Sequence, residues 1–247
     1  MRAENISVQY GKKEILHKLS FEIKKGSYVG FLGLNGCGKS SLLKALYGVL
    51  KTKEGCIFLD EKPLEQFTKK ERAKQMAVMA QQEDSFDFLV YDFVLLGRSP
   101  YKSFLEQDTK EDEKIVMEAL QLVGMEDFVN RTVSTLSGGE RQRVLLARGI
   151  AQKTPYFILD EPTNHLDLPN QLKLLQLMKQ LDCTVIMAIH DLNLALKYCD
   201  YVYCLQNGQI VGEGVPSKLL TKEWIGQFYG VEVELVEDQK GRRHIVY

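Results

Sequence analysis

The chain has 247 residues, 45% of them hydrophobic, and its 32 lysine and arginine residues face 33 aspartate and glutamate residues, for a formal net charge of -1. This length allows a substantial core, organised as one α/β domain or as one domain with an inserted subdomain. The balanced charge excludes a global basic field that would recruit nucleic acid or anionic lipid.

The N-terminus lacks an apolar signal core, and no apolar run approaches the roughly 20 residues of a membrane helix. We therefore expect a cytosolic chain that reaches a membrane only through partners. Five cysteines are scattered along the chain without the paired spacing of a zinc site, and we expect them to be reduced and mostly in the core.

The N-terminal segment is predicted to form two strands joined by a turn. Ile6 to Tyr10 alternates apolar and polar residues, as a half-exposed strand does, and a second short strand is expected near Ile15, after a turn at Gly11. Tyr28 to Leu32 is apolar throughout, which is typical of a strand buried on both faces.

A glycine-rich loop follows this buried strand and leads into an apolar helix. It reads GLNGCGKS from Gly33 to Ser40, which fits the pattern G-x-x-x-x-G-K-S in a strand–loop–helix context. Glycines let backbone N–H groups close around phosphate oxygens, Lys39 offers a positive charge to the β and γ phosphates, and the Ser40 hydroxyl can ligate Mg²⁺. The motif predicts a bound nucleotide. The residues expected to hold it are Gly33, Asn35, Gly36, Cys37, Gly38, Lys39, Ser40 and Ser41.

The middle of the chain alternates strands with helical stretches. Strands are predicted over Gly55 to Asp60 and Met76 to Ala80, with a short charged helix from Lys69 to Gln75 between them. Residues 85–134 are predicted to form a helical insert, in which Thr109 to Val123 has helical periodicity. Near its start, apolar residues either form a partner surface or pack inside: Phe86, Phe88, Leu89 and Tyr91.

A polar glycine pair marks the next helix. Gly138 and Gly139 follow Ser137 and precede apolar positions at helical spacing. We therefore expect a helix N-terminus whose free N–H groups point outward, and such an end binds anions.

A buried strand with two carboxylates at its end comes directly afterwards. Tyr156 to Leu159 is apolar without alternation, and it is followed by Asp160 and Glu161. Ligands of open parallel sheets collect at the carboxyl ends of the strands. The natural interpretation is a metal site with a base.

The rest of the chain continues the alternation. Leu168 to Leu181 is predicted to be an amphipathic helix, and Thr184 to Ile189 a buried strand that ends at His190. A lone histidine at a strand end is more often structural than catalytic. A hairpin is predicted around the turn at Asn207 and Gly208. Two short helices and a final strand pair close the chain: Pro216 to Leu220, Lys222 to Tyr229, Val231 to Val236, and His244 to Tyr247.

The run from Leu136 to Asp167, with the Gly33 to Ser41 loop, resembles the signature motif, Walker B motif, D-loop and Walker A motif of ABC-type ATPases, and the resemblance extends over nearly the whole chain. It implies an α/β fold: a P-loop NTPase core, with a mainly parallel sheet, flanking helices and an antiparallel β part, and an inserted α-helical subdomain. The core would comprise residues 1–84 and 135–247, and the subdomain residues 85–134.

The resemblance also implies roles in ATP binding and hydrolysis. Tyr10 would stack on adenine, Glu161 would polarise the attacking water, and His190 would contact the γ phosphate and orient that water. Gln81 would reach both the metal and the water, although the adjacent Gln82 leaves the register open.

Mg²⁺ would be held by Ser40, Gln81 and Asp160, and Asp167 in the D-loop would couple two sites. In this family the Walker A motif of one copy faces the signature of another, so hydrolysis would need an ATP-sandwich dimer of two copies. The signature residues acting in trans would be Leu136, Ser137, Gly138, Gly139 and Glu140.

The segment Gly97 to Tyr101 resembles the Gly-Arg-x-Pro-His sequence of ATPases that serve iron-chelate, haem and cobalamin importers, with Tyr101 as a departure. The resemblance implies an energy-coupling ATPase on the cytoplasmic face of the cell membrane, with two permease subunits, an extracytoplasmic solute-binding protein, and no nucleic acid. The alternative is a non-transport ABC ATPase acting on nucleic acid or as an assembly scaffold. A small-molecule kinase would need neither the signature nor His190.

Overall fold

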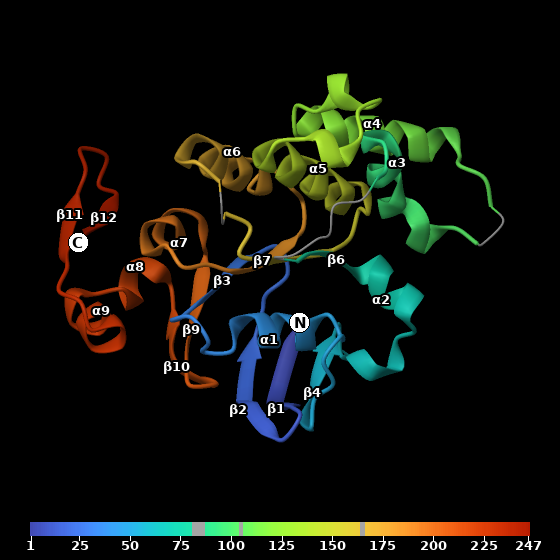
Figure 1. The fold of residues 1–247 in the computed structure, drawn as a ribbon. Helices are drawn as coiled ribbons and strands as arrows, with labels where there is room; N and C mark the ends of the chain where they lie inside the picture. The colour runs from blue at the N-terminus through green and yellow to red at the C-terminus, as the bar shows by residue number, and fades with distance from the viewer. Residues whose placement is uncertain (81–86, 104–105, 164–165) are drawn as a thin grey trace. The chain divides into compact units, whose positions relative to one another are not determined.

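The computed structural model describes residues 1–80, 87–103, 106–163 and 166–247. These residues fold as two compact units: a terminal unit, Met1–Gln66 with Thr184–Tyr247, and a middle unit, Phe67–Cys183. In Figure 1 the terminal unit carries the blue and the red ends of the chain, and the middle unit carries the green and yellow part. The predicted division into a core and a helical subdomain at residues 85–134 stays a prediction.

The terminal unit begins with an antiparallel sheet of strand order β2-β1-β4-β5. Its strands are β1 (Arg2–Tyr10), β2 (Lys13–Glu22), β4 (Glu54–Leu59) and β5 (Lys62–Pro63). β1 and β2 are longer than predicted, because register shifts near Ala3, Ile6 and Val8 interrupt the alternation that sequence reasoning looks for. Asn5 and Lys18, each at a φ of 48°, lie at these irregularities. A strand start at Ile6 was therefore wrong.

Parallel strands form the second sheet of this unit. β3 (Tyr28–Leu32) pairs in parallel with β8 (Thr184–Ala188) and β9 (Tyr201–Gln206), and β10 (Gln209–Gly214) is antiparallel to β9. Every residue of β3 and β8 is buried, as their continuous apolar runs predict. The carboxyl ends of β3 and β8 lie at the same edge, and the chain leads from them into α1 (Lys39–Leu46) and α7 (Leu192–Tyr198).

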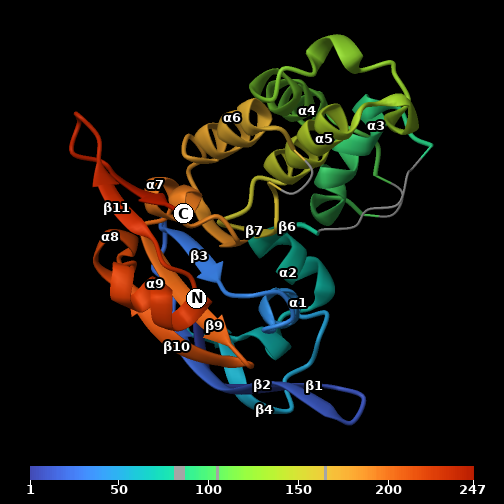
Figure 2. The ribbon, with the colours of Figure 1, turned by 60° about the vertical axis from the view of Figure 1, so that its left-hand side comes forward.

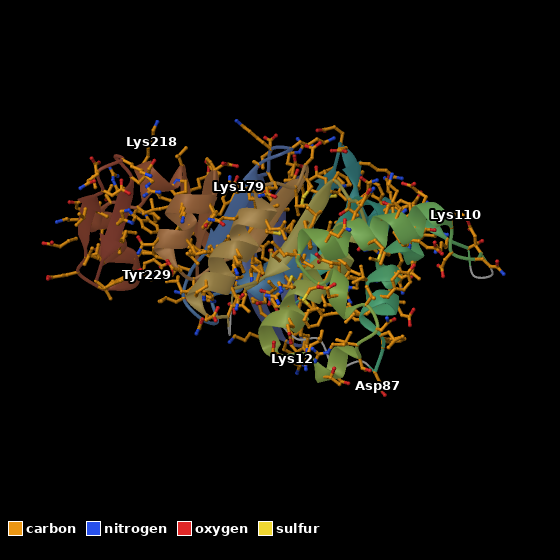
Figure 3. All side chains as sticks on the ribbon, turned by 90° about the horizontal axis from the view of Figure 1, so that it is seen from above. Lys12, Asp87, Lys110, Lys179, Lys218 and Tyr229 are labelled. Carbon is orange, nitrogen blue, oxygen red and sulfur yellow. The ribbon has the colours of Figure 1, made fainter. Side chains whose placement is uncertain are left out.

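The C-terminal part of the terminal unit adds two short helices and a hairpin. They are α8 (Pro216–Leu219), α9 (Lys222–Tyr229), β11 (Glu234–Glu237) and β12 (Arg243–Val246). β11 and β12 pair with each other, and β12 packs against α7. Figure 2 shows the C-terminus beside α7, and Figure 3 labels Lys218 on α8 and Tyr229 at the end of α9.

The middle unit pairs β6 (Met76–Met79) in parallel with β7 (Tyr156–Asp160). Its α-helices in the described ranges are α2 (Lys69–Gln75), α3 (Val90–Leu95), α4 (Lys110–Leu122), α5 (Gly138–Ala151) and α6 (Leu168–Met178). The prediction that α6 continues to Leu181 was wrong, because the helix ends at the C-cap Lys179, which Figure 3 labels. In the described parts of the chain, no helix combines the length and apolarity needed to span a bilayer.

The segment Gly97 to Tyr101 packs against the C-terminal part of α5. A Cβ on Gly97 would lie 2.4 Å from the backbone oxygen of Arg148, so only glycine allows this approach. The Tyr101 hydroxyl donates to the backbone oxygen of Gln152 at 2.9 Å, just beyond the end of α5. The motif therefore has a structural role in the middle unit.

Arg98, 8% exposed, is the central group of this contact. Its guanidinium donates to the Asp112 carboxylate and to the backbone oxygen of Ala151, both at 2.9 Å, and so ties α4 to the end of α5. Burial alone would raise the pKa of Asp112, but hydrogen bonds from Thr109, Arg98 and Lys102 outweigh it and hold that pKa well below its usual range. Asp112 is therefore an anion at neutral pH, paired with Arg98.

The apolar residues near the start of α3 divide between surface and interior. Phe88 and Leu89 are 43% and 41% exposed, Tyr91 is half-buried, and the neighbouring Val90 and Phe93 are buried. Phe86 lies outside the described residues. An exposed pair of this size does not by itself identify a partner.

Candidate functional site

The glycine-rich loop, residues 33–41, joins β3 to α1 in the terminal unit. A Cβ on Gly33 would lie 2.4 Å from the backbone oxygen of Leu205, so a side chain cannot be accommodated there. Gly36 lies at a φ of 77°, and a Cβ on it would meet nothing within 4 Å, so this part of the loop faces open space. Lys39 is 4% exposed, and its Nζ donates to the Gly33 backbone oxygen at 2.8 Å. An open loop backbone with a lysine folded against it fits a phosphate group.

The turn of the β9–β10 hairpin is hydrogen-bonded to this loop. Gly208 donates its N–H to the Cys37 backbone oxygen at 3.0 Å, and its own oxygen accepts the His17 N–H at 2.9 Å. A Cβ on Gly208 would lie 2.0 Å from the Ile15 backbone oxygen, so the contact requires glycine. Sequence reasoning missed this role, because the dipeptide at 207–208 already had a sufficient explanation as a hairpin turn.

The remaining predicted loop residues differ in exposure. Asn35 is exposed, and Ser40 and Ser41 are half-buried. Cys37 is 7% exposed and its Sγ packs towards Gly33, so it presents its backbone rather than its thiol. Outside the loop, Tyr10 at the end of β1 is 71% exposed, as an aromatic ring available for stacking must be.

His190 lies at the same sheet edge as the loop. β3 and β8 are in parallel register with Phe31 opposite Ala188, and the Ile189 N–H donates to the Phe31 oxygen at 3.1 Å. His190 is the next residue, so it leaves the sheet where the loop begins. The Asp191 carboxylate then caps α7, which fixes the backbone directly after the histidine.

The predicted signature forms the start of α5 in the middle unit. Ser137 is the N-cap, and its hydroxyl and backbone N–H both donate to the Glu140 carboxylate at 2.8 Å, while the Glu140 N–H donates back to the hydroxyl. These bonds from Ser137 lower the pKa of Glu140. Leu136 is 5% exposed and serves the core, and a Cβ on Gly138 would meet nothing within 4 Å. The predicted helix start is therefore confirmed, and the space beside Gly138 is open, whereas anion binding by its N–H groups stays a prediction.

The two carboxylates follow β7, as predicted. Asp160 is the last residue of this strand and is 6% exposed. Glu161 lies at a φ of 54°, in the left-handed region that residues with a Cβ seldom adopt. Such backbone strain persists where the surroundings enforce it, and it is frequent at active sites.

Two glutamine side chains hold the segment that follows. Gln142 of α5 donates to the Pro162 oxygen at 2.8 Å. Gln171 of α6 donates to the oxygens of Thr163 and Leu166 at 3.1 and 3.0 Å. Sequence reasoning missed both glutamines, since a polar residue at helical spacing reads as a solvated face.

Asp167 is the N-cap of α6, where its carboxylate accepts the Asn170 N–H at 3.0 Å. Arg143 of α5 donates to the Asn170 side chain at 3.5 Å, so the starts of α5 and α6 are adjacent. The structure thus brings the predicted signature and Asp167 together within the middle unit. Gln81 lies outside the described residues.

The residues predicted to bind Mg²⁺ offer ligand atoms of the type that this ion prefers. Ser40 and Asp160 offer a hydroxyl and a carboxylate, and Mg²⁺ prefers oxygen ligands. Within the described ranges, no three His, Cys, Asp or Glu side chains form a metal-binding group. Mg²⁺ commonly takes one or two protein ligands and completes its shell with water and substrate phosphates, so this sparse set suits it.

Residues 16–164 match the protein-family model described as ABC transporter. The chain belongs to the ABC transporter family. ATP-binding subunits of ABC transporters are ATPases coupled to transport, so the nucleotide predicted for the glycine-rich loop is ATP. The resemblance inferred from the sequence is confirmed.

Sequence similarity to named proteins extends over nearly the whole chain. The petrobactin import ATP-binding protein FpuD of Bacillus anthracis is 37% identical over 243 residues, which cover 96% of this chain and 89% of the relative. The ferric enterobactin transport ATP-binding protein FepC of Escherichia coli is 35% identical over 243 residues, 96% of this chain and 90% of the relative. These relatives do not favour the non-transport alternative.

Solved structures confirm the predicted P-loop NTPase fold. A putative metal-chelate type ABC transporter in an inward-facing conformation has a TM-score of 0.85 at 28% identity, covering 99% of this chain and 95% of that chain. A bacterial ABC transporter cassette solved as a dimer has a TM-score of 0.78 at 27% identity, covering 87% of this chain and 98% of that chain. Cassettes of this family thus form dimers.

Proposed function

We propose that this ABC ATPase powers the import of an iron chelate, a siderophore or haem, or of a cobalamin-like solute. The observation that carries the proposal is the set of relatives, 34–37% identical over at least 95% of the chain, that are named for petrobactin, siderophore, iron(3+)-hydroxamate or ferric enterobactin transport. The Gly97 to Tyr101 motif adds support, because it resembles the Gly-Arg-x-Pro-His sequence of ATPases that serve this importer class.

ATP would bind the terminal unit through the glycine-rich loop. The open backbone at Gly36 would donate N–H groups to phosphate oxygens, Lys39 would neutralise β and γ phosphate charge, and Tyr10 would stack on adenine. Ser40, Gln81 and Asp160 would hold Mg²⁺. When bound, the ion offsets the negative charge of the phosphates.

Hydrolysis would use a water placed by two side chains. Glu161 would polarise the water and His190 would orient it towards the γ phosphate. Phosphoryl transfer needs little from the protein beyond such positioning and charge compensation.

A second copy would complete each site. The start of α5, with Ser137, Gly138 and Gly139, would face the γ phosphate bound by the other copy, and its N–H groups would compensate that charge. Release of Ser137 from the Glu140 carboxylate, which now holds it at 2.8 Å, would accompany this contact. Asp167, at the cap of α6, would link the two sites of the dimer.

Transport would require further partners. Two permease subunits would carry the solute, an extracytoplasmic binding protein would deliver it, and the ATPase would sit on the cytoplasmic face of the membrane. Residues 85–134 would act as the helical subdomain of the family, and Gln81 would signal between the nucleotide and the permeases.

Uptake by cells tests this proposal. Cells that lack the gene are tested for uptake of radioactive iron supplied as a ferric siderophore, of radioactive iron supplied as haem, and of labelled cobalamin. Deleting the gene should abolish uptake of one of these solutes. The wild-type gene should restore uptake, and the Glu161→Gln variant should not. Unchanged uptake of all these solutes in the deletion strain would contradict the assignment to this importer class, even if the purified chain hydrolyses ATP.

A further inference from the structure

The C-terminal hairpin, β11 with β12, lies outside residues 16–164 that match the family model. It is a well-formed element: Asp238 accepts the Lys240 and Arg242 N–H groups at 2.8 and 2.9 Å, which closes the turn between the strands. Its strands pair only with each other among the described residues. A two-stranded hairpin is marginal alone, so what holds it to the unit matters.

Asn193, in the first turn of α7, makes the link. Its side-chain amide donates to the Ile245 backbone oxygen at 2.9 Å, and its side-chain oxygen accepts the Ile245 N–H at 2.8 Å. The side chain thus pairs with both backbone groups of one residue, as a neighbouring strand would. Ile245 is 3% exposed, so both bonds are shielded from competing water.

His190 lies just before the first turn of α7, separated from it only by the N-cap Asp191. The Asp191 carboxylate accepts the backbone N–H groups of Asn193 and Leu194 at 2.8 and 3.0 Å. Asp191 therefore fixes the start of α7, and Asn193 joins that start to β12. The C-terminal strand β12 therefore contacts the segment that follows the histidine through Asn193.

We propose that Asn193 is a positioning residue for ATP hydrolysis, which holds the backbone after His190 in place by pairing α7 with the C-terminal strand β12. The inference rests on the proposed role of His190. Asn193 itself touches no reacting atom. α7 spans only Leu192–Tyr198, and the paired bonds of Asn193 add to the Asp191 cap in holding its first turn.

The test compares full-length variants by steady-state ATP hydrolysis, with the wild-type rate measured alongside. Asn193→Ala should lower kcat by about tenfold while KM for ATP stays unchanged, since a misplacement of about 1 Å can cost up to a hundredfold. Asn193→Asp is isosteric and keeps the acceptor for the Ile245 N–H, but it sets a carboxylate oxygen against the Ile245 oxygen, so kcat should fall in this variant as well.

Arg243→Ala is the matched control. It removes another tie of the same hairpin, the bond from Arg243 to the Ser217 oxygen at 2.5 Å, which does not involve α7. Its kcat should equal that of the wild type. An unchanged kcat in both Asn193 variants, an equal loss in Arg243→Ala, or a change confined to KM would each overturn the proposal. Absence of hydrolysis by the wild type would instead reject the proposed function.

Discussion

The loop that follows β3 and the loop that follows β7 both leave a buried parallel strand, yet they are held in different ways. The glycine-rich loop is held by a backbone group of another element and by one side chain of its own: the Gly208 N–H donates to the Cys37 oxygen, and the Lys39 ammonium donates to the Gly33 oxygen. The segment after Glu161 is held by side-chain amides, those of Gln142 and Gln171. Apart from Lys39, the first loop should therefore tolerate side-chain changes but not a Cβ on its glycines. The second loop should be loosened by the loss of one polar side chain.

Lys39→Ala should have the largest effect, because it removes the only charged group that the glycine-rich loop itself contains. We expect kcat/KM for ATP hydrolysis to fall by about a thousandfold, as losing a preorganised charge at a phosphoryl site does. ATP titration and steady-state kinetics measure this. Ordinary turnover would show that the backbone alone suffices in this loop.

Glu161→Gln tests the second loop at its strained residue. Glutamine keeps the shape but cannot take a proton, so hydrolysis should slow by about a hundredfold or more. ATP should then hold the variant as a dimer, which size-exclusion chromatography with ATP can detect. Rapid turnover by this variant would refute the assignment of Glu161 as the base.

Gly208→Ala tests the backbone support of the first loop. At a φ of 72°, with the Ile15 oxygen 2.0 Å from the new Cβ, the change should lower the free energy of unfolding by more than the ~1–3 kcal/mol of φ strain alone. KM for ATP should rise several-fold. Gly230→Ala is the control, since it has a φ of 71° with nothing within 4 Å of its Cβ. Equal effects in both variants would mean that strain, rather than the contact to the loop, is responsible.

Gln142→Leu should have the smallest effect. It removes one hydrogen bond to Pro162, which contributes about 1 kcal/mol, so we expect kcat to fall about fivefold with KM for ATP unchanged. Gln176→Leu, at an exposed position of α6, is the control and should leave kcat unchanged. A larger loss than in Glu161→Gln would show that the amides matter more than the carboxylate they position.

Local sequence predicted a large part of the fold and of the candidate site. Tyr28–Leu32 and Lys69–Gln75 form the predicted strand and helix with the predicted bounds. Such agreement is expected where one pattern dominates, as a continuous apolar run or a capping box does. The starts of β1 and β2 were missed because bulges break the alternation, and bulges depend on pairing between strands.

The sequence by itself identified the family of this protein and predicted its chemistry, from the glycines, lysine and serine of the loop after β3, the carboxylate pair after β7, the histidine after β8 and the signature. These are local patterns, in which residue type and spacing along the chain are enough to predict a function. Only the tertiary structure decided what supports them: Gly208 behind Cys37, Gln142 on Pro162, and Asn193 on Ile245. Each of these contacts uses a backbone group of a distant residue. Because backbone groups are the same in almost every residue, a sequence pattern cannot show which of them will be a partner.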